Sequence, residues 1–293
     1  MKISLKLKSA ALVLSCYIMW GVLPVFWKLY GDFNSLYILA LRIIFSSVVS
    51  FAAVIGFGKL NEIKEVMRDK KQLVSLSLAG IFIGINWGSY IYAVNSSHIL
   101  DASLAYFLNP LIAFALGIIF FKEKLSKIKI LSVVIAAIGI VVPFVMYKTV
   151  PVFAFVIGGS FAVYSAIKKN VKVSAVTSIF IETAVLLPLA IAMSIAFELN
   201  GINIKSSLSE MELILPLVSG IVTSLPLLLF SKGIKNISMS LCGVLMYINP
   251  TLQMLIGIFA YNEKLDTAKI IMFACVWSAL VIFLIAENKK APE

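Results

Sequence analysis

The chain has 293 residues, of which 61% are hydrophobic and 13% are charged, and its formal net charge is +11. An average soluble domain is roughly 45–50% apolar and about 25% charged, and a soluble globule of this size has too small a core to hide so much apolar surface. The composition therefore excludes an ordinary cytosolic enzyme, a disordered chain and a disulfide-bonded secreted scaffold. It indicates that the solvent of this protein is lipid.

Ten apolar runs follow one another, each close to the length of about 20 residues that a membrane-spanning helix needs. They cover residues 9–30, 36–57, 73–94, 101–121, 127–146, 150–168, 174–197, 212–232, 239–260 and 267–286. The first run follows Lys2, Lys6 and Lys8 as a signal peptide would, but it has no evident cleavage site, so we interpret it as a retained span. The predicted fold class is an all-α integral membrane protein with ten transmembrane helices.

The basic residues are distributed unevenly between the segments that join these runs. Nineteen of the 25 lysines and arginines lie in the terminal segments and in the loops on the same side, whereas four lie on the other side. The positive-inside rule then predicts a multi-pass protein with both termini on the inner side of the membrane. This distribution explains the positive charge without a nucleic acid partner. Residues 59–72 place Leu60, Ile63, Val66 and Met67 on one face among lysines, which predicts a short surface helix.

The second half of the chain repeats the first at a single offset of 140 residues. Residues 107–130 and 247–270 are identical at 9 of 24 positions without a gap, including Asn109-Pro110 against Asn249-Pro250. We therefore predict two five-helix repeats, residues 1–146 and 147–293. Because five is odd, the second copy is expected upside down relative to the first. Inverted repeats are typical of secondary transporters with a solute site near the bilayer midplane; the alternative is that duplication only built a stable bundle.

Two charged residues lie deep within the predicted spans, where they are costly and usually functional. Arg42 is in the second span and Glu182 in the seventh, and the repeat offset relates them. They are candidates to bind a polar or zwitterionic solute, and Glu182 is a candidate to carry a coupling proton. The structural alternative is a buried pair that fixes one span against another. Lys28, near the outer end of the first span, is a further candidate to bind the solute; the alternative is that it extends to the interface.

Prolines and polar residues add to this pattern. Five prolines lie within spans, and each removes a backbone hydrogen bond: Pro24, Pro110, Pro188, Pro226 and Pro250. We therefore expect broken helices, with the two Asn-Pro pairs as the best indication of a transporter site. Aromatic and amide side chains lie near these positions at helical spacing. They complete the candidate substrate-binding residues: Trp20, Asn86, Trp87, Tyr90, Tyr106, Asn109, Tyr164, Asn249 and Gln253. Gly80, Gly84 and Gly88 favour close packing of the third span against another helix.

Several chemistries have no motif in this sequence. There is no phosphate-binding loop for ATP, no metal-binding helix motif, and one histidine only. We expect no metal, no cofactor and no catalytic residue. The weak enzyme alternative is His98 with Asp101, which are three residues apart; Asp101 is better explained as a helix cap.

Five ordered motifs carry a resemblance to a known family. They are MWGVLP (19–24) with FWK (26–28), NWGSYIYAVN (86–95), DASLAYFLNP (101–110), IETAVLLP (181–188) and YINPTL (247–252). The chain resembles, from end to end, the RarD branch of the drug/metabolite transporter superfamily, which is built from two EamA-type repeats. The resemblance implies ten spans, a plasma (inner) membrane location and both termini in the cytoplasm. It also implies a central cavity between the halves and peripheral fifth and tenth spans. Leu41 departs from the family's usual His, Asp101 stands for Glu, and Met246 and Asn249 stand for Gln and Gly.

The functional hypothesis is a secondary transporter that exports a small polar or amphipathic metabolite, such as an amino acid, by alternating access. Its expected partners are the lipid bilayer, a small-molecule solute and, as an option, a coupling proton; a homo-oligomer is permitted. The main alternative is a multidrug exporter with a loose aromatic pocket. The alternatives outside transport are a membrane scaffold and an intramembrane enzyme.

Overall fold

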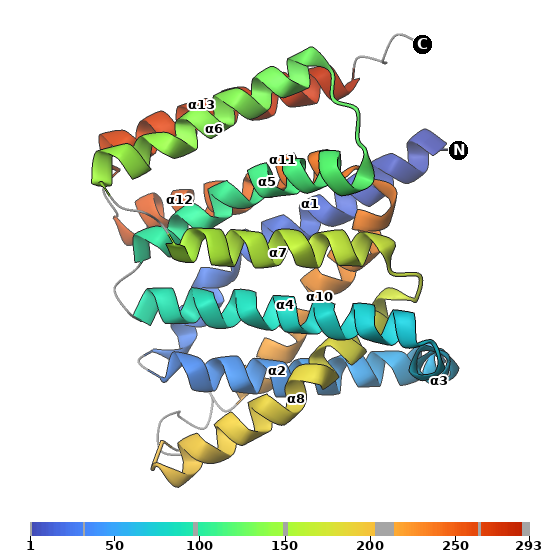
Figure 1. Cartoon of the computed structure of the whole chain (residues 1–293). Coiled ribbons are helices and arrows are strands. Elements are labelled where there is room, and N and C mark those ends of the chain that lie inside the picture. The colour runs from blue at the N-terminus through green and yellow to red at the C-terminus, as the bar shows by residue number, and fades with distance from the viewer. Residues whose placement is uncertain are drawn as a thin grey trace.

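A computed structural model of the chain describes residues 2–31, 33–95, 99–148, 152–202, 214–262 and 265–288, and every regular element in these ranges is a helix. The helices form one bundle (Figure 1). They are α1 (Lys2–Trp27), α2 (Ser35–Gly56), α3 (Leu60–Arg68), α4 (Lys70–Asn95), α5 (Ile99–Phe121), α6 (Lys127–Tyr147), α7 (Val152–Asn170), α8 (Ala175–Leu199), α10 (Leu215–Gly233), α11 (Met239–Met246), α12 (Ile248–Tyr261) and α13 (Thr267–Asn288), with the short turns η1 (Lys28–Tyr30) and η3 (Ile234–Asn236). His98, the side chain of Asp101 and residues 263–264 of the repeated segment 247–270 lie outside what the structure describes.

Within the described ranges, ten helical stretches are long and apolar enough to cross a membrane. Their bounds differ from the predicted runs by a few residues, for example Leu5–Tyr30 for 9–30 and Met239–Tyr261 for 239–260. Large apolar side chains cover much of the molecular surface, as lipid requires and water does not favour. The structure thus confirms the predicted fold class of an all-α integral membrane protein.

Polar side chains mark where several of these helices begin. The Asn34 carboxamide oxygen accepts hydrogen bonds from the backbone N–H groups of the first turn of α2, and Asp69 does the same for α4. Ser126, Ser174 and Ser238 cap α6, α8 and α11. Such caps satisfy N–H groups that a helix leaves without an internal partner. They fix the residue at which each of these helices begins.

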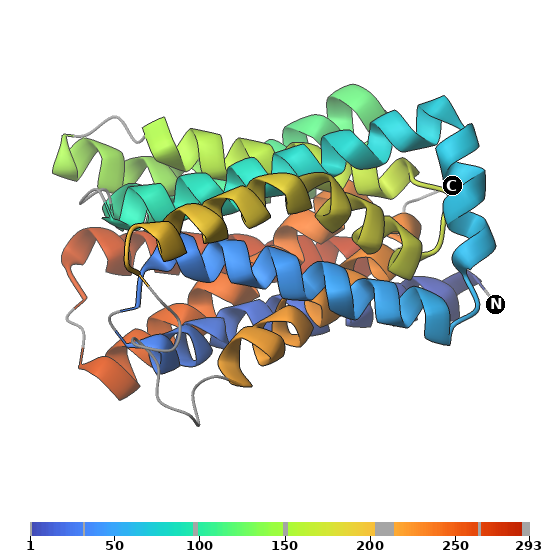
Figure 2. The same cartoon turned by 90° about the horizontal axis from the view of Figure 1, so that it is seen from below.

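The two ends of the bundle differ. The start of α1, helix α3 and the end of α13 all lie at one end, which we call the terminal end; we call the opposite end the distal end (Figures 1 and 2). Helix α3 crosses the terminal end as a separate short helix. Its Val66 is 1% exposed and its Met67 is 60% exposed. One side of the predicted surface helix therefore packs on the protein, and part of its apolar side remains free.

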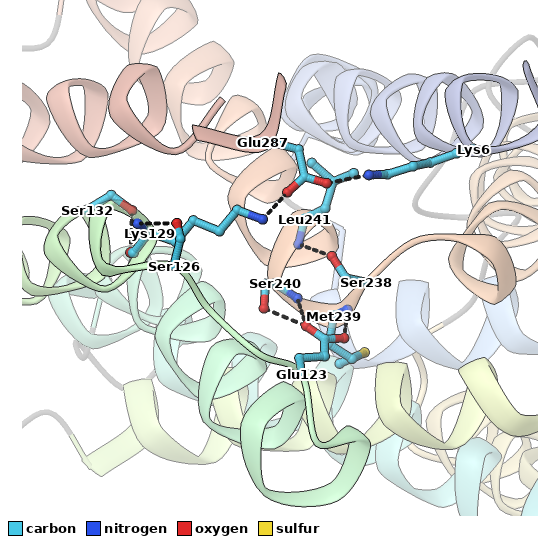
Figure 3. A network of polar contacts seen from close by, with 10 residues as sticks. All are labelled: Lys6, Glu123, Ser126, Lys129, Ser132, Ser238, Met239, Ser240, Leu241 and Glu287. Atoms are coloured by element: carbon cyan, nitrogen blue, oxygen red, sulfur yellow. Dashed lines mark hydrogen bonds and ion pairs between the residues drawn. The ribbon is translucent and has the colours of Figure 1, made fainter. Parts of the chain in front are cut away.

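Charged and polar side chains join the spans at the terminal end (Figure 3). Glu287 near the end of α13 forms ion pairs with Lys6 of α1 and Lys129 of α6. Glu123, which follows α5, accepts hydrogen bonds from the first N–H groups of α11, 2.6 Å from Met239 N and 3.1 Å from Ser240 N. These contacts hold five helices together at this end.

Helices α6 and α13 pack on each other along their length at one edge of the bundle (Figure 1). The contact is close, because a Cβ atom added to Gly139 would lie 2.4 Å from Cys275 Cβ. Neither helix contributes to the central cavity described below. This arrangement agrees with the peripheral fifth and tenth spans that the family resemblance implies.

The glycines of α4 make the close helix crossing that their spacing predicts. A Cβ atom on Gly80 would lie 2.6 Å from the backbone oxygen of Glu182 in α8. The repeat offset relates Gly80 to Gly220 of α10, where an added Cβ atom would also lie 2.6 Å from the backbone oxygen of Phe45 in α2. Gly84 also packs tightly, whereas a Cβ atom on Gly88 would meet open space. The prediction therefore holds for two of the three glycines in α4.

The expected helix breaks occur at one of the five prolines; α8 and α10 are continuous through Pro188 and Pro226. Helices α1 and α5 run without interruption through Pro24 and Pro110, because the turns on either side of each proline keep their own hydrogen bonds. The ninth span is divided at Tyr247 into α11 and α12, three residues before Pro250. There the Tyr247 N–H bonds to Val244 O at 3.2 Å, which tightens the turn. The prediction of twin breaks is wrong for the first half of the chain.

Candidate functional site

A central cavity of about 110 Å³ lies between α1, α2, α4, α5, α7, α11 and α12. Nine of the twelve predicted substrate-binding residues line it: Trp20, Arg42, Asn86, Trp87, Tyr90, Tyr106, Asn109, Asn249 and Gln253. Its other lining residues are Leu23, Pro24, Trp27, Ala105, Ile157, Gly158, Phe161 and Met246. Residues from both halves of the chain thus surround one space. The three predicted residues that do not line it are Lys28, Tyr164 and Glu182.

The Arg42 guanidinium lies between two tryptophan rings. Its Cζ atom is 4.9 Å from the ring centroid of Trp27 and 4.3 Å from that of Trp87. The Nε atom is buried and has no hydrogen-bond partner. Among the residues that the structure describes, no carboxylate forms an ion pair with Arg42. The protein therefore surrounds this cation with aromatic faces and leaves its charge without a counterion.

Two asparagines of the cavity wall hold helices together. Asn86 of α4 donates a hydrogen bond from Nδ2 to Ile157 O at 2.7 Å, and Asn109 of α5 donates from Nδ2 to Gly158 O at 2.9 Å. Both acceptors are backbone carbonyls of α7. Gly158 itself permits the close approach, since a Cβ atom there would lie 3.2 Å from Ala105 O. The amides that the sequence suggested for solute binding therefore also fix α7 against α4 and α5.

On the side toward the terminal end, a cluster of aromatic rings closes the cavity. Tyr17, Trp20, Phe161, Tyr164 and Phe230 pack with ring centroids 5.3–6.1 Å apart. Tyr17 lies one turn before Trp20 in α1, and its hydroxyl is 3.2 Å from Cys242 Sγ. Tyr164 is therefore part of the floor of the cavity, one layer below the space itself.

Glu182 lies beyond this floor, nearer the terminal end, in a buried ion pair with Lys168. Lys168 is 0% exposed and Glu182 is 1% exposed. The Glu182 carboxylate also accepts hydrogen bonds from Ser178 Oγ at 2.6 Å and from the Tyr164 hydroxyl at 3.1 Å. Sequence reasoning missed Lys168 as the partner. The signal was available, because a carboxylate inside a span needs a cation or several donors.

Lys28 lines a second space, the distal cavity, with a volume of about 260 Å³. Its Nζ atom lies 2.9 Å from the ring centroid of Tyr261. Lys269 and Tyr147, which are also at the distal end, line the same space. The distal cavity and the central cavity share Pro24, Tyr90, Tyr106 and Gln253 in their walls. The two spaces are therefore neighbours along the path from the centre of the bundle to the distal end.

A bundle of ten apolar spans around a cationic, aromatic cavity has the architecture of a polytopic membrane transporter. Comparison with known proteins places it more narrowly. A model of the EamA-like transporter family matches residues 7–145. The chain is 36% identical to the uncharacterized transporter YojE of Bacillus subtilis over 93% of this chain and 92% of that one, and 33% identical to protein RarD of Escherichia coli K12 over the same shares. The chain belongs to the RarD branch of the drug/metabolite transporter superfamily.

A solved crystal structure has the same fold. It superimposes with a TM-score of 0.74 over 96% of this chain and 99% of its own, at 18% sequence identity. A likeness at this identity concerns the fold alone. The names of the relatives add that this multi-pass membrane protein is a transporter.

Proposed function

We propose that the protein is a secondary transporter that moves a small polar or amphipathic metabolite, such as an amino acid, outward through the membrane. The observation that carries this proposal is the Arg42 guanidinium in the central cavity, with two tryptophan rings beside it and no protein counterion in the described structure. Such a cation inside a span is expensive unless a solute uses it. Arg42 would meet an anionic group, and the aromatic rings would stack on the apolar body of the solute.

Alternating access would come from rocking of the two predicted inverted repeats, residues 1–146 and 147–293, about this cavity. The helix contacts support it. The repeat offset relates α1 to α7, α2 to α8, α4 to α10 and α5 to α11–α12. Contacts occur in matching pairs under this relation: α4–α7 with α10–α1, α5–α7 with α12–α1, and α4–α8 with α10–α2. A pseudo-twofold axis between the halves would produce this pattern.

Glu182 is the proposed carrier of a coupling proton. Protonation would neutralise the partner of Lys168 and leave a buried cation without its counterion. The free energy of the packed terminal end would then rise, which favours opening on that side. We further propose that the terminal end, which carries most of the basic residues, faces the cytoplasm of the plasma (inner) membrane. Reporter fusions at either terminus test this orientation.

The transport proposal is tested with purified protein in liposomes. A thermal-shift screen of metabolites first identifies a solute, and its flux is then measured with and without a pH gradient. Arg42→Ala should abolish flux while the variant still folds, and Arg42→Lys should retain part of it. Lys148→Gln, an exposed change at the distal end outside both cavities, serves as the control. Normal flux in Arg42→Ala would show that the assigned role of Arg42 is wrong.

A multidrug exporter with a loose aromatic pocket is the second candidate, and the ring cluster around Trp20 favours it. The two candidates differ in selectivity. A metabolite carrier should respond to one solute class and depend on Arg42, whereas a multidrug exporter should accept unrelated apolar compounds and tolerate the loss of Arg42.

A further inference from the structure

The distal cavity and the central cavity share a charge pattern. Together they are lined by three cations, Lys28, Lys269 and Arg42, and no aspartate or glutamate occurs among the described residues of either wall. Glu182, which could have met an ammonium group, lies outside both walls in its ion pair with Lys168. A path with cations alone attracts anions and disfavours cations.

We infer that the solute is a monoanion with a small apolar body, and that the distal cavity is a docking site which such an anion occupies before it reaches Arg42. This inference rests on the proposed function, because it names the solute class and entry site of the same transporter. A zwitterion would bring its ammonium group into a cavity whose described wall has no carboxylate, which costs solvation that no described group there restores. The inference therefore narrows the metabolites of the proposed function to anions and excludes a zwitterionic amino acid.

The geometry of the route supports two successive positions. Lys28 is exposed, and its ammonium rests on the face of Tyr261, so the group is oriented at the mouth of the distal cavity. Lys269 lies in the first turn of α13 and contributes the second positive charge. The shared wall residues Tyr90, Tyr106 and Gln253 then lie between these lysines and the central cavity. Tyrosine and glutamine side chains offer hydrogen-bond donors to a passing carboxylate.

One carboxylate near the rim of the distal cavity has to be considered. Asp266 precedes α13 and accepts hydrogen bonds from the Tyr147 hydroxyl at 2.6 Å and from Lys269 N at 2.9 Å. A partial loss of solvation opposes its ionisation, but these donors and the Lys269 charge hold the pKa of Asp266 below its ordinary value. Its carboxylate is thus engaged by a helix start and a tyrosine, and it does not line the cavity.

The cavity size limits the solute. Apolar cavities of about 150 Å³ admit benzene, and the central cavity measures about 110 Å³. Trp20, Trp27, Trp87 and Phe161 supply flat apolar walls around the guanidinium. The central cavity alone is smaller than a cavity that admits benzene, so it matches a carboxylate on a short carbon chain. Together with the adjoining distal cavity of about 260 Å³ it has room for a carboxylate attached to one ring.

The tryptophans provide a test that needs no known substrate. The chain has four tryptophans, of which Trp20, Trp27 and Trp87 line the central cavity, whereas Trp277 is 38% exposed on the peripheral helix α13. In a Trp277→Phe background, fluorescence therefore reports on the cavity. Iodide, caesium and acrylamide serve as anionic, cationic and neutral quenchers, each normalised to its quenching of free N-acetyltryptophanamide.

We expect normalised quenching by iodide to exceed that by caesium several-fold at low ionic strength, and the excess to fall as salt is added. Lys28→Gln with Lys269→Gln should remove most of this excess, and Lys148→Gln should leave it unchanged. Benzoate should raise the apparent Tm of the protein, whereas its isosteres benzyl alcohol and benzylammonium should not. Equal quenching by iodide and caesium, or stabilisation by benzylammonium, would overturn the inference.

The outcomes separate this inference from the proposed function. Quenching and thermal shift report binding and need no transport. Anion-selective quenching in a protein that carries no solute in liposomes would support the docking site and contradict the transport proposal. Flux of a cation or a zwitterion that depends on Arg42, without anion-selective quenching, would support transport and contradict the docking site.

Discussion

The buried pair Lys168–Glu182 offers a quantitative test of how this protein tolerates charge inside the membrane. Both side chains are essentially inaccessible, and the carboxylate has two further donors in Ser178 and Tyr164. Removal of one partner leaves the other as an uncompensated buried charge, which costs about 3–5 kcal/mol. Glu182→Gln alone and Lys168→Gln alone should therefore each be strongly destabilising.

The double variant should behave differently. Two glutamines in place of the pair leave no buried charge, and their amides can hydrogen-bond to each other and to Ser178. We expect the double variant to be much more stable than the sum of the single changes, with a coupling free energy of a few kcal/mol. At about 2 °C per kcal/mol for a long chain, each single variant should lose roughly 6–10 °C of apparent Tm, and the double variant should recover most of it.

Thermal unfolding of the purified protein in detergent measures these shifts, with Lys172→Gln, an exposed lysine next to α7, as the control. If the double variant is as unstable as the two single losses added together, the pair is not coupled and the reasoning fails. The same proteins in liposomes test the proton proposal. Flux in the double variant that no longer responds to a pH gradient would support Glu182 as the proton carrier, and unchanged coupling would contradict it.

Two other predictions concern helix packing and capping. Gly80→Leu should prevent folding, because its Cβ atom would lie 2.6 Å from the backbone oxygen of Glu182, whereas Gly88→Ala faces open space and should lower the yield of folded protein little; size-exclusion profiles of both variants check this. Glu62 of α3 is partly buried, which raises its pKa, but hydrogen bonds from Ser174 and Thr177 outweigh this and lower the pKa of Glu62. A group with a lowered pKa stabilises the fold above its ordinary pKa of about 4.3 and loses this as the pH falls through the lower folded value. Glu62→Gln should therefore cost about 1 kcal/mol at neutral pH after allowance for solvent screening, and the difference in apparent Tm from the wild type should vanish in acid; a constant difference would contradict it.

The spans and most of the cavity could be predicted from the sequence for the same physical reason. Lipid allows few polar atoms, so each apolar run had to be a span and each polar group within a run had to face other protein. Arg42, Asn86 and Asn109 were placed at the cavity on this basis, and all three line it.

The other features of the site could not be predicted, because they depend on distances between residues that a sequence does not contain. The pairing of Glu182 with Lys168 requires the turn between α7 and α8, and the repeat offset pointed instead to Arg42. Ile157 and Gly158 were missed because they take part through backbone carbonyls, which no side-chain pattern reveals. The helix break at Tyr247 was placed at Pro250, because proline marks where one hydrogen bond is lost and not where the chain turns.

Arg42 and Glu182 occupy related positions in the sequence, yet the protein treats their charges in opposite ways. Glu182 has a cation and two further donors, whereas Arg42 has two aromatic faces, worth about 0.5–2 kcal/mol each, and a buried Nε atom without a partner, which costs about 1–3 kcal/mol. In the empty protein these terms nearly cancel, so Arg42→Met should unfold at the same temperature as the wild type or above it, while it loses stabilisation by benzoate. A loss of apparent Tm as large as that of Glu182→Gln would show that Arg42 is a structural group. If the variant keeps its stability and loses benzoate binding, the protein leaves the Arg42 charge without a counterion because an anionic solute supplies one. Such a loss of stability for the sake of function is expected at a binding site.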